Sequence, residues 1–551
     1  PPPPAFAAPP PHPGTGWPSR IAPTPPPKRS GRTGLWTGTA VIAGLAAVAV
    51  AFAVVGVGSP AEATFSAPDR VFTSEWLRFT APEPTDLLPG NTHFGSTGSL
   101  ATALYEGLTR IDPETGEPVA AAAEHWSSSD QQSWTFTLRD GMTFHNGDPV
   151  TAQSFVDAWE FTANPSHNQY GQYQFSMFEG YGSGIIGVTA TSDTELTVKL
   201  AEPWSTFPIA LADPAFAPLP DDCVTSVDAC AHLAIGNGPF HMQSEWAPGE
   251  SLRLTAWKEH HDGPVQYGGI EFTFGDDQER FLAMLASNDA DMVVSEERDL
   301  AEVPSTVTLP SSRLTSLVLP DEKPYKKTAI REAISGAIDR AELTGAFGSA
   351  ATAADGFVPP MLPGALEGSC ENCVHDPEGA KAAFKDAKWP KKTKLRIGHF
   401  ESSMQTTTAE VLCRQLSSAL GVDCELKPES DYVAYLERMA SPSYPMIGSW
   451  LPDQATAESF LRQYYQEYLG VDDEELAALV DEGNAAGNVQ GAAGGFGEAQ
   501  RRLDELMPVV PLMYGNTSVA LSDMVVPESV VLDRATNAIR VDLIELRPAE
   551  D

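Results

Sequence analysis

The sequence predicts a large bilobal protein of the α/β class, and two observations support this. The chain has 551 residues, which makes more than one domain the first expectation. Short segments with strand-like alternation dominate before about residue 310. Beyond it, helical and extended segments alternate, a pattern typical of an α/β layer with a mostly parallel sheet. The alternating segments are helix 326–339, a helix starting at Asp376-Pro377, strand 393–398, helix 406–420, strand 422–426, helix 431–439 and strand 445–450.

Individual elements follow from local patterns. Residues 133–139 (SWTFTLR) alternate apolar and polar side chains as a half-buried strand does. Asn146-Gly147 predicts a turn, and Thr151 can cap the helix that follows. Asp376-Pro377 predicts a helix start. The remaining expected elements are strand 70–79, helix 96–107, strands 194–200, 251–255 and 270–274, helices 278–287, 458–469, 472–483 and 496–507, and a strand-rich tail over 509–551.

The charge is strongly asymmetric. The formal net charge is −39, and all 74 acidic residues follow residue 61, whereas four cations precede it. Such an acidic globular part repels phosphate backbones, so the sequence argues against nucleic-acid binding.

The first sixty residues predict a membrane-related segment. Residues 1–34 contain 13 prolines, which is typical of a disordered tail. The apolar run 35–57 would span about 35 Å as a helix, enough to cross a bilayer. Cations before the run and acids after it predict a cytoplasmic N-terminus and an extracytoplasmic main part. Two interpretations stay open: a retained anchor over 35–58, or a signal segment cleaved after an A-x-A site at 61–63.

The six cysteines fall into three local pairs, Cys223/Cys230, Cys370/Cys373 and Cys413/Cys424. In an exported chain an even number favours disulfides. A redox pair or half of a zinc site at Cys370-x-x-Cys373 is the alternative, and the connectivity stays open.

Catalytic and metal motifs are not found. G-x-S-x-G, H-E-x-x-H and G-x-x-x-x-G-K-[ST] do not occur, so the chain is expected not to be an enzyme and to need no cofactor. His260-His261, between Glu259 and Asp262, is the densest group of metal-ligand types. Adjacent side chains on a regular element point to different faces and chelate poorly, so no metal site is predicted there.

Aromatic residues are dense in the polar segment 164–184. Rings in such a segment either fill the core or line a pocket. Tyr173 is the ring that we take as a candidate for ligand contact.

Several segments together resemble the solute-binding proteins of peptide-type ABC importers, family 5, which includes oligopeptide- and dipeptide-binding proteins. The most specific is WTFTLRDGMTFHNGDPVTAQSFVDAW at 134–159. Others are YEGLTRIDPETGEPVAAAAEHW at 105–126, NGPFHMQSEWAPGESLRL at 237–254, AIREAISGAIDRAEL at 329–343 and PVVPLMY at 508–514. The resemblance covers about residues 70–545. It implies a bilobal periplasmic-binding-protein-like fold with an extra subdomain in the first lobe.

The resemblance also implies a ligand site in GSWLPDQATAESFL at 448–461. In the oligopeptide binders a Trp is followed three residues later by an Asp that holds the peptide's α-ammonium group, and Trp450 and Asp453 have this spacing. A buried carboxylate needs a cation, which a bound ammonium supplies. Main chain near Ser449 and Leu451 could pair with an extended peptide. The alternative is that Asp453 caps helix 458–469 or its preceding turn.

Two departures from the family keep the ligand class open. Gln454 and the three residues after it lack the aromatic and proline common in the family, and His260-His261 replace an aromatic pair. The expected function is an extracytoplasmic receptor that delivers peptides to permease subunits driven by cytoplasmic ATPases. The alternative is a receptor or sensor of the same fold for a metal chelate, haem or sugar. The chain is expected to be a monomer attached to the membrane through residues 35–57, or exported after cleavage.

The predicted organisation has six parts. They are a cytoplasmic tail over 1–34, the anchor or signal over 35–58, a linker over 59–69, lobe I over 70–309 with an inserted subdomain at about 100–186, lobe II over 310–508, and a return to lobe I over 509–551.

Overall fold

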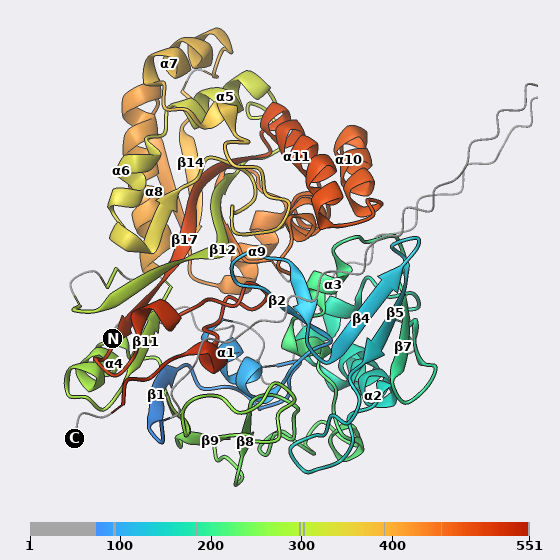
Figure 1. Cartoon of the computed structure of the whole chain (residues 1–551). Helices are drawn as coiled ribbons and strands as arrows, with labels where there is room; N and C mark the ends of the chain where they lie inside the picture. Colours follow the sequence, from blue (N-terminus) through green and yellow to red (C-terminus); the bar gives the residue numbers. More distant parts are fainter. Residues whose placement is uncertain are drawn as a thin grey trace, which may run out of the picture. The chain divides into compact units, whose positions relative to one another are not determined.

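The main sheet is mixed and draws strands from most of the chain (Figure 1). Its order is β15-β14-β16-β12-β17-β11-β1-β10-β9-β8, with β13 paired to β17. In chain order these strands are β1 (Trp76–Ala81), β8 (Phe240–Met242), β9 (Leu252–Ala256), β10 (Gly269–Phe274), β11 (Met292–Ser295), β12 (Thr306–Val318), β13 (Ala351–Ala353), β14 (Leu395–Phe400), β15 (Cys424–Glu429), β16 (Met446–Trp450) and β17 (Val509–Leu521).

The structure is a computed structural model, and it describes residues 73–91, 95–182, 186–296, 299–300, 303–390, 392–452 and 454–548. The predicted tail, anchor or signal, and linker (1–34, 35–58 and 59–69) lie outside these residues. Among the helices in the described ranges, none combines the length and the apolar composition needed to cross a bilayer.

Two smaller sheets stand apart from the main sheet. One is a hairpin, and the other has the order β4-β5-β7-β6. The hairpin strands are β2 (Thr109–Ile111) and β3 (Pro118–Ala120), and the others are β4 (Ala123–Ser128), β5 (Ser133–Leu138), β6 (Val188–Ala190) and β7 (Glu195–Lys199). The alternation predicted over 133–139 is confirmed, because Trp134, Phe136 and Leu138 are buried.

The two helix starts predicted from capping residues are confirmed. Thr151 accepts a hydrogen bond from the Ser154 amide at the start of α2, and Asp376 accepts one from Gly379 at the start of α7. The helices are α1 (Gly95–Leu104), α2 (Ala152–Ala163), α3 (Phe207–Ala210), α4 (Gln278–Ala286), α5 (Thr328–Gly336), α6 (Arg340–Gly345), α7 (Pro377–Asp386), α8 (Ser403–Leu420), α9 (Tyr432–Ala440), α10 (Glu474–Asn484) and α11 (Val489–Leu506). Short 3₁₀ turns connect several of them.

The helix predicted over 458–469 is confirmed as Ser459–Tyr468, and it is a π-helix rather than an α-helix. Its end shows the wider turn, because the Leu469 amide donates to the carbonyl of Tyr464, five residues back. The buried pairs Phe460-Leu461 and Tyr464-Tyr465 recur every four residues. This spacing suits either helix type, so the apolar pattern could not separate them.

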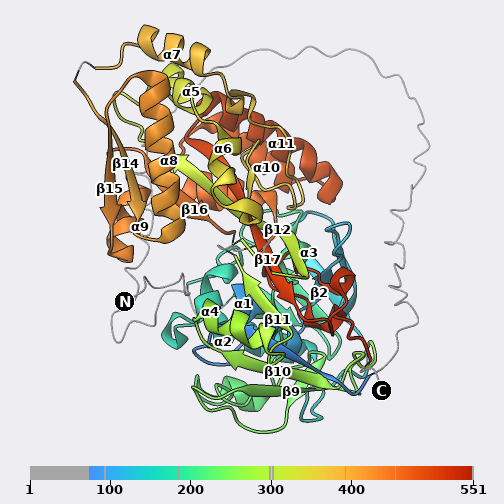
Figure 2. The ribbon, with the colours of Figure 1, turned by 90° about the vertical axis from the view of Figure 1, so that its left-hand side faces the viewer.

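The expectation of a parallel layer holds only locally. β14 pairs parallel with β15 and with β16, and α8 packs beside β14 and β15 (Figure 2). The sheet then continues antiparallel, because β12 pairs antiparallel with β16 and β17, and β17 pairs antiparallel with β11. The long strands β12 and β17 lie side by side along most of their length.

The described residues form two large hydrophobic cores and one small cluster around Phe281 and Leu285. The first core takes its side chains from residues 77–292 and 519–546, around Phe79, Phe136 and Trp159. The second takes nearly all of its side chains from residues 314–514, around Tyr464 and Phe496. β17 supplies residues to both cores. Three disulfides join Cys223–Cys230, Cys370–Cys373 and Cys413–Cys424.

His145 bridges two segments of the first core and should make stability depend on pH. Its Nδ1 accepts from the Gly236 amide at 3.1 Å, and its Nε2 lies 3.0 Å from the Gly238 carbonyl oxygen. Burial lowers the pKa of His145 from 6.5 to about 4. The folded state thus favours the neutral ring. Its contribution is complete above about pH 6.5 and is lost as the pH falls toward 4, by about 3 kcal/mol.

Urea unfolding at pH 7.5 and pH 5, with EDTA present, should show about 2 kcal/mol of this loss. In His145→Gln both hydrogen bonds can form without a titratable ring. We therefore expect the free energy of unfolding to differ less between the two pH values in this variant. His241 and His260, which act on His145 electrostatically, stay in both proteins. If the free energy of unfolding of His145→Gln changes with pH as much as that of the original chain, other groups cause the pH dependence.

Candidate functional site

Strand β16 extends past the end of its neighbour β14. On one side Ser449 and Trp450 pair antiparallel with β12. On the other side, Gly398 lies opposite Met446 in the parallel register, and β14 ends at Phe400, whereas β16 continues to Trp450. Among the described strands, nothing pairs with this side of Ser449 and Trp450. Such an edge offers main-chain donors and acceptors to a further strand.

A cavity of about 90 Å³ lies beside this edge. Its lining comes from β12, the start of α8, helix α9 and β16. The lining residues are Arg313, Thr315, Ser402, Met404, Gln405, Tyr432, Tyr435, Leu436, Met439 and Ser449. The cavity thus lies beyond the carboxyl end of β14, where open α/β sheets commonly bind ligands.

A chain of hydrogen bonds fixes the cavity wall. The Tyr435 hydroxyl donates to the Ile447 carbonyl at 2.8 Å and accepts from Gln405 Nε2 at 3.1 Å. Gln405 Oε1 in turn accepts from the Phe400 amide at 2.9 Å. Burial raises the pKa of Tyr435 far above its ordinary value, so its hydroxyl stays protonated. The network ties α8 and α9 to the ends of β14 and β16.

Among the described residues that line the cavity, Arg313 alone is charged. Its Nη2 lies 2.5 Å from Glu296 Oε2, and both side chains are half-buried. A guanidinium has five N–H donors, so Arg313 can keep Glu296 and still donate to a ligand oxygen.

Trp450 combines stacking with an unsatisfied donor. Its ring stacks on Tyr464, with centroids 4.9 Å apart, and contacts Tyr468 at 5.3 Å. Its Nε1 is buried and has no hydrogen-bond partner among the described residues. A buried donor without a partner costs about 1–3 kcal/mol, which a ligand carbonyl would recover.

The structure brings only some of the predicted ligand residues together. Ser449 lines the cavity, and Trp450 and half-buried Leu451 follow it directly along the chain. Asp453 lies outside the described residues, so its role stays a prediction. Tyr173, in the 3₁₀ turn Tyr170–Phe175, is 39% exposed and does not line this cavity.

Two other rings of the aromatic run pack in the first core. Phe175 and Phe178 are almost fully buried, with centroids 5.3 Å apart, and both contact Trp159. Of the two interpretations of this run, core filling applies to these two rings.

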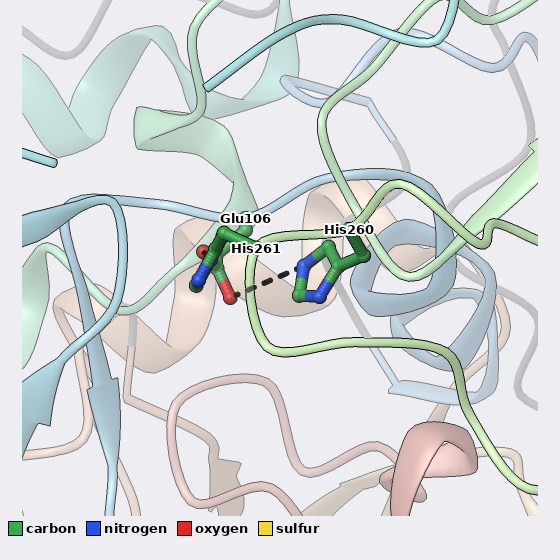
Figure 3. Close-up of side chains that lie close together, drawn as sticks. All are labelled: Glu106, His260 and His261. Carbon is green, nitrogen blue, oxygen red and sulfur yellow. Dashed lines mark hydrogen bonds and ion pairs between the residues drawn. The ribbon is translucent and has the colours of Figure 1, made fainter. Parts of the chain in front are cut away.

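A second group of side chains, with atoms of the types that ligate metals, lies where Glu106 meets His260 and His261 (Figure 3). Glu106 follows α1, and the two histidines lie between β9 and β10. Glu106 Oε1 is 2.5 Å from His261 Nε2, and Glu106 Oε2 is 3.9 Å from His260 Nε2. The expectation that adjacent histidines diverge is wrong here. They occupy a turn closed by the Gly263 amide and the His260 carbonyl, and their ring centroids are 4.4 Å apart.

Electrostatics in this group favour ionised carboxylates. Burial opposes the charge of Glu106, but His261 and Arg110 outweigh it and lower the pKa of Glu106 to about 2. Burial also opposes the charge of His261, but Glu106 and Asp262 outweigh it and raise the pKa of His261 to about 9. Burial lowers the pKa of His260 and keeps this ring neutral.

Sequence reasoning missed Glu106, Arg313 and Tyr432. Glu106 is far from His260 along the chain, so only the tertiary fold reveals the contact. The cavity could have been approached from the sequence, because its place follows from the predicted ends of strands 393–398 and 445–450.

Comparison with known proteins gives relatives named for peptide binding. Oligopeptide-binding protein OppA of Bacillus subtilis (strain 168) is 25% identical over 486 residues, covering 78% of this chain and 86% of the relative. Dipeptide-binding protein DppE of the same organism is 24% identical over 478 residues, covering 79% and 85%.

Solved structures share the fold. The unliganded open form of the periplasmic murein tripeptide-binding protein MppA matches with a TM-score of 0.74 at 21% identity, covering 87% of this chain and 99% of that one. Haemophilus influenzae OppA in complex with RPPGFSPFR matches with a TM-score of 0.65 at 20% identity, covering 86% and 99%. The mixed α/β fold thus matches that of bilobal periplasmic binding proteins.

The family resemblance seen in the sequence is confirmed. A family model described as "Bacterial extracellular solute-binding proteins, family 5 Middle" matches residues 117–469, well over half of the chain. The chain therefore belongs to the family 5 bacterial extracellular solute-binding proteins.

Proposed function

We propose that this chain is the extracytoplasmic receptor of an ABC importer, that it captures peptides and that it delivers them to permease subunits driven by cytoplasmic ATPases. Family membership and relatives named as oligopeptide- and dipeptide-binding proteins support this. These relatives are binding proteins, which fits a function without covalent chemistry.

The observation that carries the proposal is the open edge of β16 beside the cavity. An extended peptide would add to Ser449 and Trp450 as a further strand, with its main chain supplying the hydrogen bonds. Trp450 Nε1, buried without a partner in the described ranges, would donate to a peptide carbonyl. Because such pairing uses main chain, it would accept peptides of many sequences.

The amino end of the peptide would be held by charge. Asp453 follows Trp450 by three residues and would pair with the α-ammonium group. Leu451, between Trp450 and Asp453 in the sequence, would offer main-chain groups to the peptide. Tyr173 remains a candidate for a contact from the other part of the molecule.

Capture would proceed by closure of two lobes about the long strands. We propose lobe I over 70–309, with the insertion at about 100–186, lobe II over 310–508 and a return to lobe I over 509–551. The division of the side chains between two large cores, with β17 contributing to both, supports this proposal. Two strands that cross between such bodies can absorb a hinge rotation with small changes in each residue. We propose further that the receptor is a monomer, held at the membrane through residues 35–57 or released after cleavage.

Native mass spectrometry of the purified full chain tests this function. We expect adducts at many peptide masses, which disappear after mild denaturation and refolding. A single defined non-peptide mass would overturn peptide capture while leaving the family assignment in place. Incubation of the stripped protein with a mixed peptide library should restore the adducts without cleavage of any peptide.

A further inference from the structure

The main chain of Glu106 is held in place by a neighbouring side chain. The Glu106 amide donates to Asn237 Oδ1 at 2.9 Å, and Asn237 Nδ2 donates to the Glu106 carbonyl at 2.9 Å. Both residues are buried. This reciprocal pair holds the turn after α1 against the segment before β8, so the main chain that carries the Glu106 carboxylate is fixed before any ligand binds.

His261 lies beside a carboxylate, as many metal-binding histidines do. Its Nδ1 lies 3.1 Å from Asp262 Oδ1, and Asp262 Oδ2 is 2.6 Å from Arg110 Nη2. A carboxylate beside Nδ1 favours the neutral tautomer with its proton on Nδ1, so Nε2 would bind a metal ion that displaces its own proton. That Nε2 atom is the one facing Glu106.

His260 supplies an independent sign of a ligand. The residue is only 7% exposed, its ring lies against Trp257, and its Nε2 has no hydrogen-bond partner among the described residues. This nitrogen points toward Glu106 at 3.9 Å (Figure 3). The distance is too long for a hydrogen bond, but a cation bound to both groups would separate them in this way.

The donors and charges of the group suit a divalent transition metal. Two imidazole nitrogens and one carboxylate oxygen all lie within 4.8 Å of one another. Glu106 and Asp262 outnumber Arg110, so with neutral imidazoles the group carries excess negative charge. Two histidines and one glutamate form a known ligand set for zinc, whereas Ca²⁺ and Mg²⁺ prefer oxygen ligands alone.

We propose that Glu106, His260 and His261 bind one divalent transition-metal ion of the zinc type, with Asp262 as the residue that positions His261. The ion links the loop between β9 and β10 to the turn after α1. It reaches the site from the side of Asp262, whose side chain is 38% exposed. None of these residues lines the cavity beside β16, so metal binding and peptide binding can be measured separately.

Titration of the tag-free full chain with Zn²⁺, after EDTA treatment and dialysis, tests the proposal by calorimetry and by metal analysis of the dialysed complex. We expect one equivalent of Zn²⁺ and a rise in melting temperature. His260→Phe, which keeps a ring beside Trp257, and His261→Ala should each weaken binding at least 100-fold. Asp262→Asn should weaken it about 10- to 100-fold, because it acts on His261 only.

His375→Ala is the matched control, since His375 is exposed and lies outside the group. It should bind Zn²⁺ like the original chain. Less than one equivalent in the original chain would overturn the proposal and leave the group as an ion pair only. Equal losses of Zn²⁺ affinity in His375→Ala and His260→Phe would also overturn it, because the metal would then bind to surface histidines. If His261→Ala does not fold, His260→Phe and Asp262→Asn decide the question.

Discussion

Asp453→Ala is expected to weaken the binding of peptides with a free α-amino group about 100-fold. The change removes the carboxylate proposed to pair with the ammonium group, and truncating one partner of a buried charge pair costs about 2–5 kcal/mol. N-acetylated peptides carry no such charge, so their affinity should change far less. Calorimetry with one peptide in both forms gives the comparison directly.

The control for this change is Asp472→Ala, because Asp472 is an exposed acid in the same part of the chain. It should leave both affinities unchanged. Equal losses for the free and acetylated peptide in Asp453→Ala would remove Asp453 from ammonium recognition. They would favour its other interpretation, a cap of the following helix or turn.

Arg340→Met is expected to lower the free energy of unfolding by about 3 kcal/mol. Arg340 is buried, and its guanidinium donates to the carbonyls of Pro511 and Cys373, both at 2.8 Å, and to the Ser335 hydroxyl at 2.9 Å. Methionine has similar length but leaves these acceptors without donors inside the second core. Burial lowers the pKa of Arg340 to about 10, so the side chain stays charged at neutral pH.

Urea unfolding at pH 7.5 measures the loss. Arg414→Met is the matched control, because Arg414 is exposed and pairs with one acid, Glu342. We expect the control to lose less than about 0.5 kcal/mol. Similar losses in the two variants would show that the buried guanidinium does not hold β17 to the loop at Cys373.

Local signals predicted much of the secondary structure. The strand predicted over 133–139 is Ser133–Leu138, and the helix predicted to start at Asp376 is capped by that residue. Alternation and caps act over a few residues, so the sequence contains their cause. The pairing of β12 with β17 joins segments about 200 residues apart, and no local pattern specifies it.

The candidate sites depend more strongly on tertiary contacts. Family resemblance directed attention to Ser449 and Trp450, and the structure adds the open edge beside them. The resemblance could not indicate Glu106 as a neighbour of His260, because that contact depends on how the turn after α1 meets the loop before β10. Expecting His260 and His261 to diverge assumed a regular element, but they lie in a turn.

The disulfides have a consequence for motion. Their cysteines are separated by 7, 3 and 11 residues, and each bond joins side chains beside one core only. Closing loops this short removes little entropy from the unfolded chain, so each bond constrains only the structure near it. None of them fastens one core to the other. With all three bonds formed, no disulfide would therefore oppose the proposed closure of the two lobes.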